Sequence, residues 1–332
     1  MTAPMEGVRV LEMAIYAFAP SAAAILADWG ADVLKVEHPV LGDPGRVTAA
    51  WGVPADVNGV SHLWEVTNRG KRAIALDVAT QEGREFLMQL VDESDVFVTN
   101  FLPAARRKLG IEPEDIQGRN PRIIYARGSA QGPRGELSER GGFDGVSYWS
   151  RSGASLGVTP PDAPVPLAMP GPGFGDLQSG MALAGGIGTA LFHRERTGEA
   201  TVVDASLMSV GLWAMGMTIS GTSVLDSDTL PHQYHRNSTN PLVNEYRTKD
   251  GGFIALAFLQ SDRYWPEFCV LVERFEWLAD DRFADSSDRA ANTEALVELL
   301  DELFLDRDLA EWQELLATQD GQWDIVLPAG QV

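Results

Sequence analysis

The sequence predicts an α/β protein with a parallel sheet covered by helices, followed by a smaller α+β domain. In the first part of the chain, short and continuously apolar segments alternate with helical ones, which is typical of a sheet buried on both faces. In the last third, a hairpin signal precedes several helical stretches. The 332 residues also exceed what one hydrophobic core usually serves, so we expect two domains.

The first βαβ unit is predicted at the N-terminus. Residues 8–13 and 33–36 form buried strands, and an Ala- and Leu-rich helix at 20–29 lies between them and stops at Gly30. Strands joined in this way are parallel, with a right-handed crossover. The elements expected next are a strand at 73–76, a helix at 81–91, a strand at 96–98, a short helix at 104–109 and a strand at 122–126.

The middle of the chain changes character at residue 128. Residues 128–172 are rich in Gly, Pro and Ser with little periodicity, so we predict loops that cover a site. A long helix of small residues then opens at Asp176 and runs to about His193. After it we expect a turn at 195–200, a short strand at 202–204 and an apolar helix at 206–219.

The second domain begins after a polar, irregular stretch at 221–234. Asp250 and Gly251 are flanked by the segments 246–249 and 253–257, which predicts a hairpin. Helices are expected at 263–275, 293–304 and 309–318. We therefore divide the chain into a large domain at 1–205, a linker helix at 206–225, a small α+β domain at 226–324 and the start of a return linker at 325–332, and we expect the natural chain to continue past Val332.

Composition excludes several classes of function. The formal net charge of −21 disfavours binding to nucleic acid or to an anionic membrane, because the long-range field repels phosphate. No signal-peptide pattern opens the chain and the longest apolar run is too short to span a bilayer, so we predict a cytoplasmic protein. The single cysteine, Cys269, lies in an apolar stretch that favours a buried, unreactive thiol. The five histidines show no metal-binding spacing, so no metal is expected.

Asp176 is the strongest candidate for chemistry. It lies in the sequence GFGDLQSG at 173–180, directly before the predicted long helix. A carboxylate there could simply cap the helix. The same geometry also suits a reactive group, since helix N–H donors could stabilise a developing oxyanion and the flanking glycines let a ligand approach. From the residues alone both interpretations stay open.

Two basic clusters stand out in this acidic chain, NRGKR at 68–72 and RRK at 106–108. Several of their residues, together with His38, follow predicted strands, where open α/β sheets bind ligands. They form either a polyphosphate site or an ordinary solvated surface. The first strand is not followed by a glycine-rich dinucleotide motif, and the chain has no Walker sequence and no nucleophile elbow.

In ordered segments along almost the whole chain, the sequence resembles the class III CoA-transferases, the family of formyl-CoA transferase, carnitine CoA-transferase and α-methylacyl-CoA racemase. The segments are GVRVL at 7–11, LADWGADVLKVE at 26–37, GDPGR at 42–46, NRGKR at 68–72, DVFVTNF at 95–101, NPRIIY at 120–125, RERTG at 194–198, VDASL at 203–207 and NPLVN at 240–244. The resemblance implies a Rossmann-like large domain, a small domain and an interlocked homodimer. It also implies that acyl-CoA and a small carboxylic acid are the substrates.

The resemblance further implies that Asp176 is the nucleophile that attacks the acyl-CoA thioester. An aspartate of ordinary pKa, about 4, would be ionised at neutral pH without a base. The positions that match CoA contacts are His38, Lys71, Arg72, Asn100, Phe101 and Lys108. The loop that would face the substrate contains Phe143, Asp144 and Gly175.

We predict a CoA-transferase that works through aspartyl-anhydride and aspartyl-CoA intermediates. Racemases of the family pair the aspartate with a histidine, but Phe143 stands at the matching position, which favours transfer. An acyl-CoA racemase and a CoA-binding protein without turnover are the alternatives. The acyl donor and acceptor stay open because the acyl pocket is built from variable loops.

Overall fold

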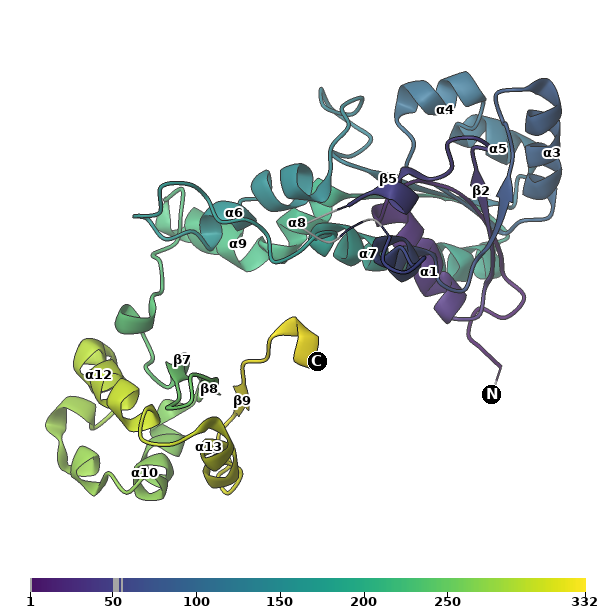
Figure 1. Cartoon of the computed structure of the whole chain (residues 1–332). Helices are drawn as coiled ribbons and strands as arrows, with labels where there is room; N and C mark the ends of the chain where they lie inside the picture. Colours follow the sequence, from purple (N-terminus) through teal and green to yellow (C-terminus); the bar gives the residue numbers. More distant parts are fainter. Residues whose placement is uncertain (1, 50–53, 55) are drawn as a thin grey trace. The chain divides into compact units, whose positions relative to one another are not determined.

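The computed structural model describes residues 2–49, 54 and 56–332, and the chain divides into two compact units, Met1–Leu230 and Pro231–Val332 (Figure 1). The division therefore falls at Leu230, a few residues beyond the linker that we placed at 206–225. The first unit contains the parallel sheet and the second an antiparallel one.

The sheet of the first unit has six parallel strands in the order β3-β2-β1-β4-β5-β6. The strands are β1 (Arg9–Met13), β2 (Asp32–Glu37), β3 (Arg72–Ala75), β4 (Val96–Thr99), β5 (Ile124–Ser129) and β6 (Val202–Ser206). The strand order reverses between β1 and β4. In open α/β sheets ligands bind beside the carboxyl ends of the strands at such a switch point. The predicted doubly wound α/β fold is confirmed.

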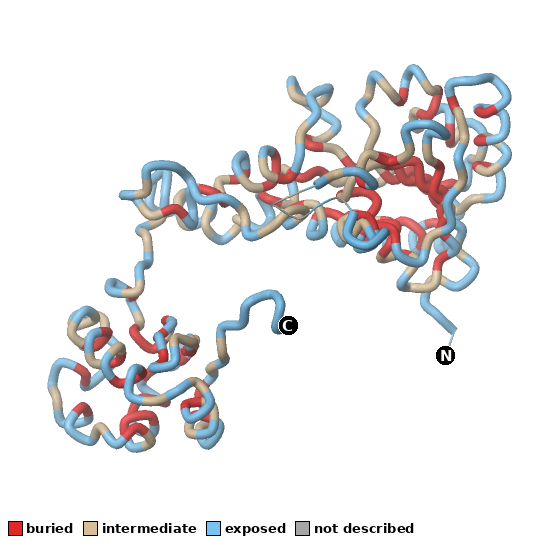
Figure 2. The backbone as a smooth tube through the Cα atoms, viewed as in Figure 1, coloured by how far each residue is buried: buried red, intermediate tan, exposed pale blue. Residues whose placement is uncertain are grey.

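Helices cover both faces of this sheet, and the interior of the unit is buried (Figure 2). Alternate residues along a strand point into two different hydrophobic cores, one on each face. Val96 and Val98 of β4 pack with α1 (Phe18–Asp28) and α7 (Phe174–Thr197), whereas Phe97 packs with α3 (Gln81–Asp92) and α5 (Pro113–Arg119). The short helix α4 (Pro103–Leu109) follows β4, and α2 (His62–Asn68) precedes β3. Burial on both faces explains why these strands are apolar without alternation.

Helices α1 and α7 pack closely because α7 carries small residues. A Cβ added at Gly180 would lie 1.9 Å from the hydroxyl of Ser21 and 3.0 Å from the carbonyl oxygen of Phe18, both in α1. The small residues of this face therefore serve helix packing rather than close contact with a ligand.

Two regions differ from the sequence prediction. Residues 128–172 are not all loop, since they contain the π-helix η2 (Gly145–Ser150) and the helix α6 (Ala154–Gly157). The single helix expected at 206–219 is broken into α8 (Leu207–Ala214) and α9 (Gly216–Leu225), which meet at 62°. Along the described part of the chain, no single helix has the length and apolar composition to cross a bilayer, and this bent pair meets that test by length and composition only.

The second unit packs helices against a three-stranded antiparallel sheet in the order β7-β8-β9. Its elements are β7 (Val243–Arg247), β8 (Phe253–Ala257), α10 (Ser261–Leu271), α11 (Ser286–Ala291), α12 (Thr293–Phe304), α13 (Leu309–Leu316) and β9 (Trp323–Ile325), with 3₁₀ turns η3 (His235–Asn237), η4 (Phe275–Ala279), η5 (Asp281–Phe283) and η6 (Ala329–Gln331). The core is rich in aromatic rings, including Phe304 and Trp312. Cys269 is fully buried there, and burial raises the pKa of its thiol to about 12, so it is not a nucleophile at neutral pH.

Candidate active site

A cavity of about 1090 Å³ opens at the carboxyl ends of the central strands. Ile15 and Tyr16 follow β1, and Asn100 and Phe101 follow β4. The other groups that line it include Phe143 and Asp176, from the loop before η2 and from the start of α7. The cavity thus lies at the switch point of the sheet and contains the aspartate that the sequence singled out.

Asp176 does not cap its helix. Helix α7 begins at Phe174 with Gly173 as the N-cap, so Asp176 is the third helical residue, and the helix has no side-chain cap. Among the described residues we find no hydrogen-bond donor to its carboxylate. The interpretation of Asp176 as a structural cap is therefore wrong, and its carboxylate is available to a ligand in the cavity.

The environment of Asp176 changes its acidity. Burial, and to a smaller extent the nearby negative charge of Asp144, raise the pKa of Asp176 to about 7. The expectation of an ordinary pKa is thus corrected, because the tertiary structure removes solvent from this carboxylate. Buried titratable groups with strongly shifted pKa values are typical of active sites.

Asp144 is the second carboxylate of the site. It is buried and lies at the N-terminus of η2, where its Oδ1 accepts a hydrogen bond of 2.8 Å from the N–H of Gly145. Burial raises the pKa of Asp144, and the backbone N–H groups of Gly145, Gly175 and Gly173 oppose that rise. The amides at the start of α7 thus face Asp144. Neither Asp144 nor Gly175 lines the large cavity, so of the predicted substrate loop only Phe143 does, and Asp144 acts on Asp176 through its charge.

The glycines of this loop are needed for packing. A Cβ at Gly175 would lie 2.4 Å from the ring of Tyr148, and a Cβ at Gly142 would lie 2.3 Å from the hydroxyl of Ser147. Tyr148 is held by a hydrogen bond of 2.7 Å from its hydroxyl to Oε1 of Gln178 on α7. Gly175, predicted to face the substrate, therefore brings η2 and α7 together behind the two carboxylates.

The loop after β1 forms another wall of the cavity and was missed by the sequence analysis. The side chain of Asn100 accepts from the N–H of Ile15 at 2.9 Å and donates to its carbonyl oxygen at 2.7 Å. Tyr16 has a left-handed backbone with φ of 63°, and its ring meets that of Phe143 edge to face at 5.4 Å. The available signal was the position of this loop at the carboxyl end of the first strand.

The predicted CoA-contact residues fall into two groups. Asn100 and Phe101 line the large cavity, and Phe101 also lines a smaller one of about 130 Å³ that contains His38. Lys71, Arg72 and Lys108 line neither of these two cavities.

Lys71 and Arg72 already have partners. The ammonium of Lys71 is buried and lies 2.6 Å from Oε2 of Glu12, whereas Arg72 is exposed and pairs with Asp32 at 2.7 Å. Burial lowers the pKa of Lys71 to about 8, against the opposing effect of Glu12. Lys108 is exposed at the end of α4.

Lys71 belongs to a buried ion network behind the loop after β1. Lys35 lies 2.6 Å from Oε1 of Glu12 and 2.9 Å from Oδ2 of Asp43, and all these side chains are at most 2% exposed. Burial opposes the charge on Lys35, but Glu12 and Asp43 outweigh it and raise the pKa of the ammonium. We call Glu12, Lys35, Asp43 and Lys71 the ion network.

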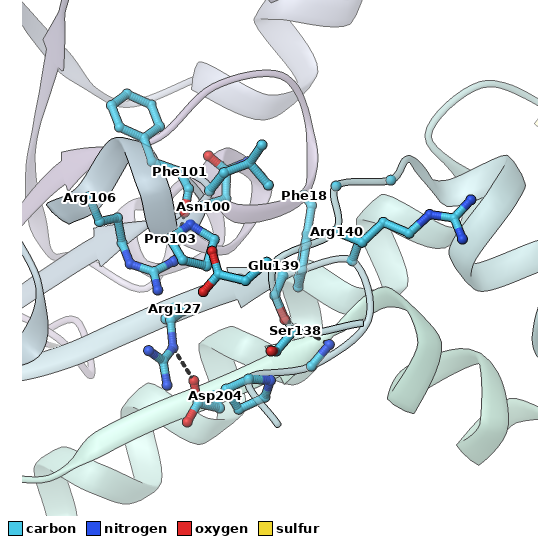
Figure 3. A pocket seen from close by; sticks show the side chains of 18 of the residues that line it. Phe18, Asn100, Phe101, Pro103, Arg106, Arg127, Ser138, Glu139, Arg140 and Asp204 are labelled. Carbon is cyan, nitrogen blue, oxygen red and sulfur yellow. Dashed lines mark hydrogen bonds and ion pairs between the residues drawn. The ribbon is translucent and has the colours of Figure 1, made fainter. Parts of the chain in front are cut away.

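Arginines also line the large cavity (Figure 3). Arg106 comes from the basic cluster at 106–108, whereas Arg127 and Arg140 were not singled out from the sequence. Arg127 of β5 pairs with Asp204 of β6, and Arg106 pairs with Glu112 at 3.0 Å. Arg140 also lines the cavity and has no hydrogen-bond or ion-pair partner for its guanidinium in the described part of the chain. Within residues 2–49, 54 and 56–332, no group of three His, Cys, Asp or Glu side chains is arranged to hold a metal ion.

Known proteins resemble this chain over almost its whole length. A profile of CoA-transferase family III matches residues 5–332. The (R)-2-hydroxy-4-methylpentanoate CoA-transferase of Clostridioides difficile is 33% identical over 316 residues, which cover 95% of this chain and 78% of the relative. The succinyl-CoA:mesaconate CoA-transferase of Haloarcula hispanica is 31% identical over 332 residues, which cover 99% of this chain and 78% of the relative.

A solved structure shows the same fold. The crystal structure of a CAIB/BAIF family protein from Brucella suis superposes with a TM-score of 0.85 at 28% identity, covering 99% of this chain and 85% of the other. With the profile match over nearly the whole chain, these similarities show that the protein is an enzyme that belongs to CoA-transferase family III.

Proposed function

We propose that this protein transfers CoA from an acyl-CoA to a free carboxylic acid, with Asp176 as the nucleophile. The observation that carries the proposal is the Asp176 carboxylate itself. It lies in a cavity of about 1090 Å³, receives no hydrogen bond from the described residues, and has a pKa raised to about 7.

The proposed reaction consists of two half-reactions, one with the acyl-CoA donor and one with the acceptor acid, and each half-reaction has two nucleophilic substitutions at a carbonyl carbon. A carboxylate oxygen of Asp176 attacks the thioester carbonyl, the C–S bond breaks, and CoA leaves as a thiolate from a mixed anhydride. The thiolate then attacks the aspartyl carbonyl, which releases the first acid as a carboxylate and leaves an aspartyl-CoA thioester. The acceptor carboxylate repeats both steps in reverse order, so that Asp176 is regenerated and no proton is gained or lost.

The surroundings of Asp176 support this role. Ionised Asp176 needs no general base, and its raised pKa makes the carboxylate a stronger nucleophile than an ordinary aspartate. The rings of Tyr16 and Phe143 line the same cavity and limit the access of water to the anhydride.

For CoA we propose a path from the large cavity, lined by Asn100 and Phe101, to the smaller cavity that contains His38. Phe101 lines both cavities and would connect them. Lys71 and Arg72 would have to leave Glu12 and Asp32 to contact CoA, so we do not carry their predicted contacts into the proposal.

The substrates are proposed only as a class. The relatives named above include a transferase for a branched hydroxy acid and one for a dicarboxylic acid, mesaconate. We therefore propose a small acyl-CoA and a small carboxylic acid without choosing between these types.

Hydroxylamine tests this proposal because it traps the covalent intermediates expected on Asp176. The protein is incubated with acetyl-, butyryl- and 4-methylpentanoyl-CoA, each with hydroxylamine, and the peptide containing Asp176 is analysed by mass spectrometry. We expect a hydroxamate on Asp176, because both the anhydride and the aspartyl thioester react with hydroxylamine. An Asp176→Ala variant is the matched control and should show none, and a wider donor panel that gives none in the wild type would reject the nucleophile.

An acyl-CoA racemase is the second candidate, because Asp144 lies near enough to Asp176 to raise its pKa and could take part in moving an α-proton. Solvent deuterium at the α-carbon of the acyl group, without CoA transfer to any acceptor, would favour it. A protein that binds CoA without turnover would show neither deuterium uptake nor hydroxamate.

We also propose that the protein is a cytoplasmic homodimer, as the family resemblance suggests. Helices α8 and α9 support a partner, since Trp213, Met217 and Val224 are 86%, 89% and 82% exposed. Light scattering should give twice the chain mass for the wild type and a shift towards the monomer for Trp213→Ser with Met217→Ser. A monomeric wild type at micromolar concentration would contradict the dimer.

A further inference from the structure

The loop between β1 and α1 lies between the large cavity and the ion network. We propose that Asp43 is a positioning residue that holds Tyr16 in its left-handed conformation beside the reactive carboxylate. The proposal rests on the function proposed above for Asp176, and it assigns to the ion network a role in that reaction.

The backbone conformation of Tyr16 requires a stabilising contact. Its φ of 63° lies in a region that residues with a bulky side chain rarely adopt. Such conformations persist where the surrounding structure enforces them, and they concentrate at functional sites. The strain therefore calls for a specific contact that fixes the backbone of Tyr16.

Asp43 supplies that contact. Its Oδ1 accepts a hydrogen bond of 2.9 Å from the N–H of Tyr16 and one of 2.8 Å from the N–H of Gly45. The carboxylate is buried, and its other oxygen lies 2.9 Å from the ammonium of Lys35. A charged acceptor in a solvent-poor site makes a strong hydrogen bond to a backbone N–H.

The ion network prevents Asp43 from moving. Lys35 also contacts Glu12 and donates to the carbonyl oxygen of Ala14 at 2.8 Å, so it is bound to the same loop. If Asp43 turned away, Lys35 would lose one of its two buried carboxylates, which is unfavourable in this environment. Asn100 fixes the neighbouring Ile15 from the other side.

A displacement of Tyr16 would affect the reacting groups through one contact, the packing of its ring on Phe143. Its ring packs edge to face on Phe143, and Phe143 directly precedes Asp144, whose charge raises the pKa of Asp176. A shift of Tyr16 would therefore move the loop that places the second carboxylate. We expect the effect on the chemical step rather than on the affinity for acyl-CoA.

A double-mutant cycle tests this coupling. Asp43→Ala, Tyr16→Gly and the double variant are compared by the single-turnover rate of Asp176 acylation with butyryl-CoA, or with the best donor of the trap. We expect each single variant to be about tenfold slower or more, because small displacements at a reacting centre have effects of this size. The double variant should be no slower than Tyr16→Gly alone, since Asp43 acts through Tyr16.

Independent losses that multiply in the double variant would overturn the proposal. Glu93→Gln, which removes an exposed ion pair with Arg9, is the control and should keep the wild-type rate. Asp43→Asn keeps an acceptor for Tyr16 but not the charge. It should acylate within about threefold of wild type while melting at a lower temperature, and a loss as large as that of Asp43→Ala would also contradict the proposed contact.

Hydrogen exchange in the wild-type protein gives a test that needs no variant. The amide of Tyr16 should exchange slowly because it donates to a buried carboxylate, and rapid exchange would overturn the proposal. Absence of any hydroxamate in the wild type would instead reject the function proposed for Asp176, so the two failures are distinguishable.

Discussion

Two pairs of carboxylates in the first unit differ in what surrounds them. Glu12, Asp43 and Asp144 are buried, and Asp176, which lines the large cavity, is half-buried. Glu12 and Asp43 each lie within 3 Å of a lysine ammonium. Asp144 and Asp176 have no cationic partner among the described residues, and the charge of Asp144 raises the free-energy cost of ionising Asp176. Burial of a carboxylate is therefore not by itself a sign of function, whereas burial without a counter-ion leaves it free to react.

The comparison also shows opposite relations to stability. A buried carboxylate beside an ammonium stabilises the fold only while both partners are present. An unpaired buried carboxylate opposes folding once it is ionised. The first arrangement fixes a loop, and the second keeps the proposed nucleophile available at a cost in stability.

The largest expected effect is on Asp176. Asp176→Asn removes the nucleophile, so acylation by butyryl-CoA should fall by about a thousandfold or more. The same change should stabilise the fold at pH 8. In the wild type the pKa of Asp176 is higher in the folded than in the unfolded state. The contribution of this one group to the free energy of unfolding is therefore fully present below about pH 4 and is lost as the pH rises through about 7.

Thermal melting at pH 5 and pH 8 measures this second effect. The melting temperature of Asp176→Asn should exceed that of wild type at pH 8, by about 2–4 °C per kcal/mol gained, with a smaller difference at pH 5. A variant that is less stable than wild type at pH 8 would show that Asp176 supports the fold after all.

The fold and the position of Asp176 in the cavity could be predicted from the sequence for different reasons. The continuous apolar strands required a doubly buried sheet, and α12 was placed at its observed bounds because its apolar residues recur with a helical period. Asp176 stood out through its glycine-rich surroundings. Its pKa could not be predicted, because the burial that raises it comes from distant parts of the chain.

The basic residues show the limit of reasoning from sequence. Lys71 and Arg72 are adjacent and looked equivalent as ligands, yet one is buried against Glu12 and the other is exposed beside Asp32. Arg72 is the first residue of β3 and Lys71 directly precedes the strand, and their partners are set by the pairing of β3 with β2 and of β2 with β1. Tyr16 was missed because a left-handed tyrosine has no signature in the sequence.

The next largest effect is expected where an ion pair is broken. Glu12→Gln leaves Lys35 and Lys71 with too few carboxylates in a buried site, so the free energy of unfolding should fall by about 3–5 kcal/mol. Urea denaturation followed by fluorescence measures it. Glu12→Gln combined with Lys71→Met removes one charge of each sign and should recover part of the loss, whereas a drop below about 1 kcal/mol in the single variant would contradict the buried network.

A smaller effect is expected in the dependence of activity on pH. Asp176 must be ionised to attack, so kcat/KM should rise with pH and level off above about 7. Asp144→Asn removes the neighbouring charge and should move the midpoint to lower pH, but not to that of a free aspartate, since burial is the larger cause. An unchanged midpoint in Asp144→Asn would mean that the two carboxylates do not interact.

The smallest effect is expected at the pair of Arg72 and Asp32, which matches Lys71 and Glu12 in distance but not in burial. The atoms are 2.7 Å apart, but the side chains are 66% and 50% exposed. Asp32→Asn should lower the free energy of unfolding by about 0.5 kcal/mol or less, and added salt should reduce the difference. If Arg72 contacts CoA after leaving Asp32, the same variant should lower KM for butyryl-CoA and Arg72→Ala should raise it. An unchanged KM in both variants would mean that Arg72 does not contact CoA. Burial would then be the property that distinguishes the pair of Arg72 and Asp32 from the pair of Lys71 and Glu12.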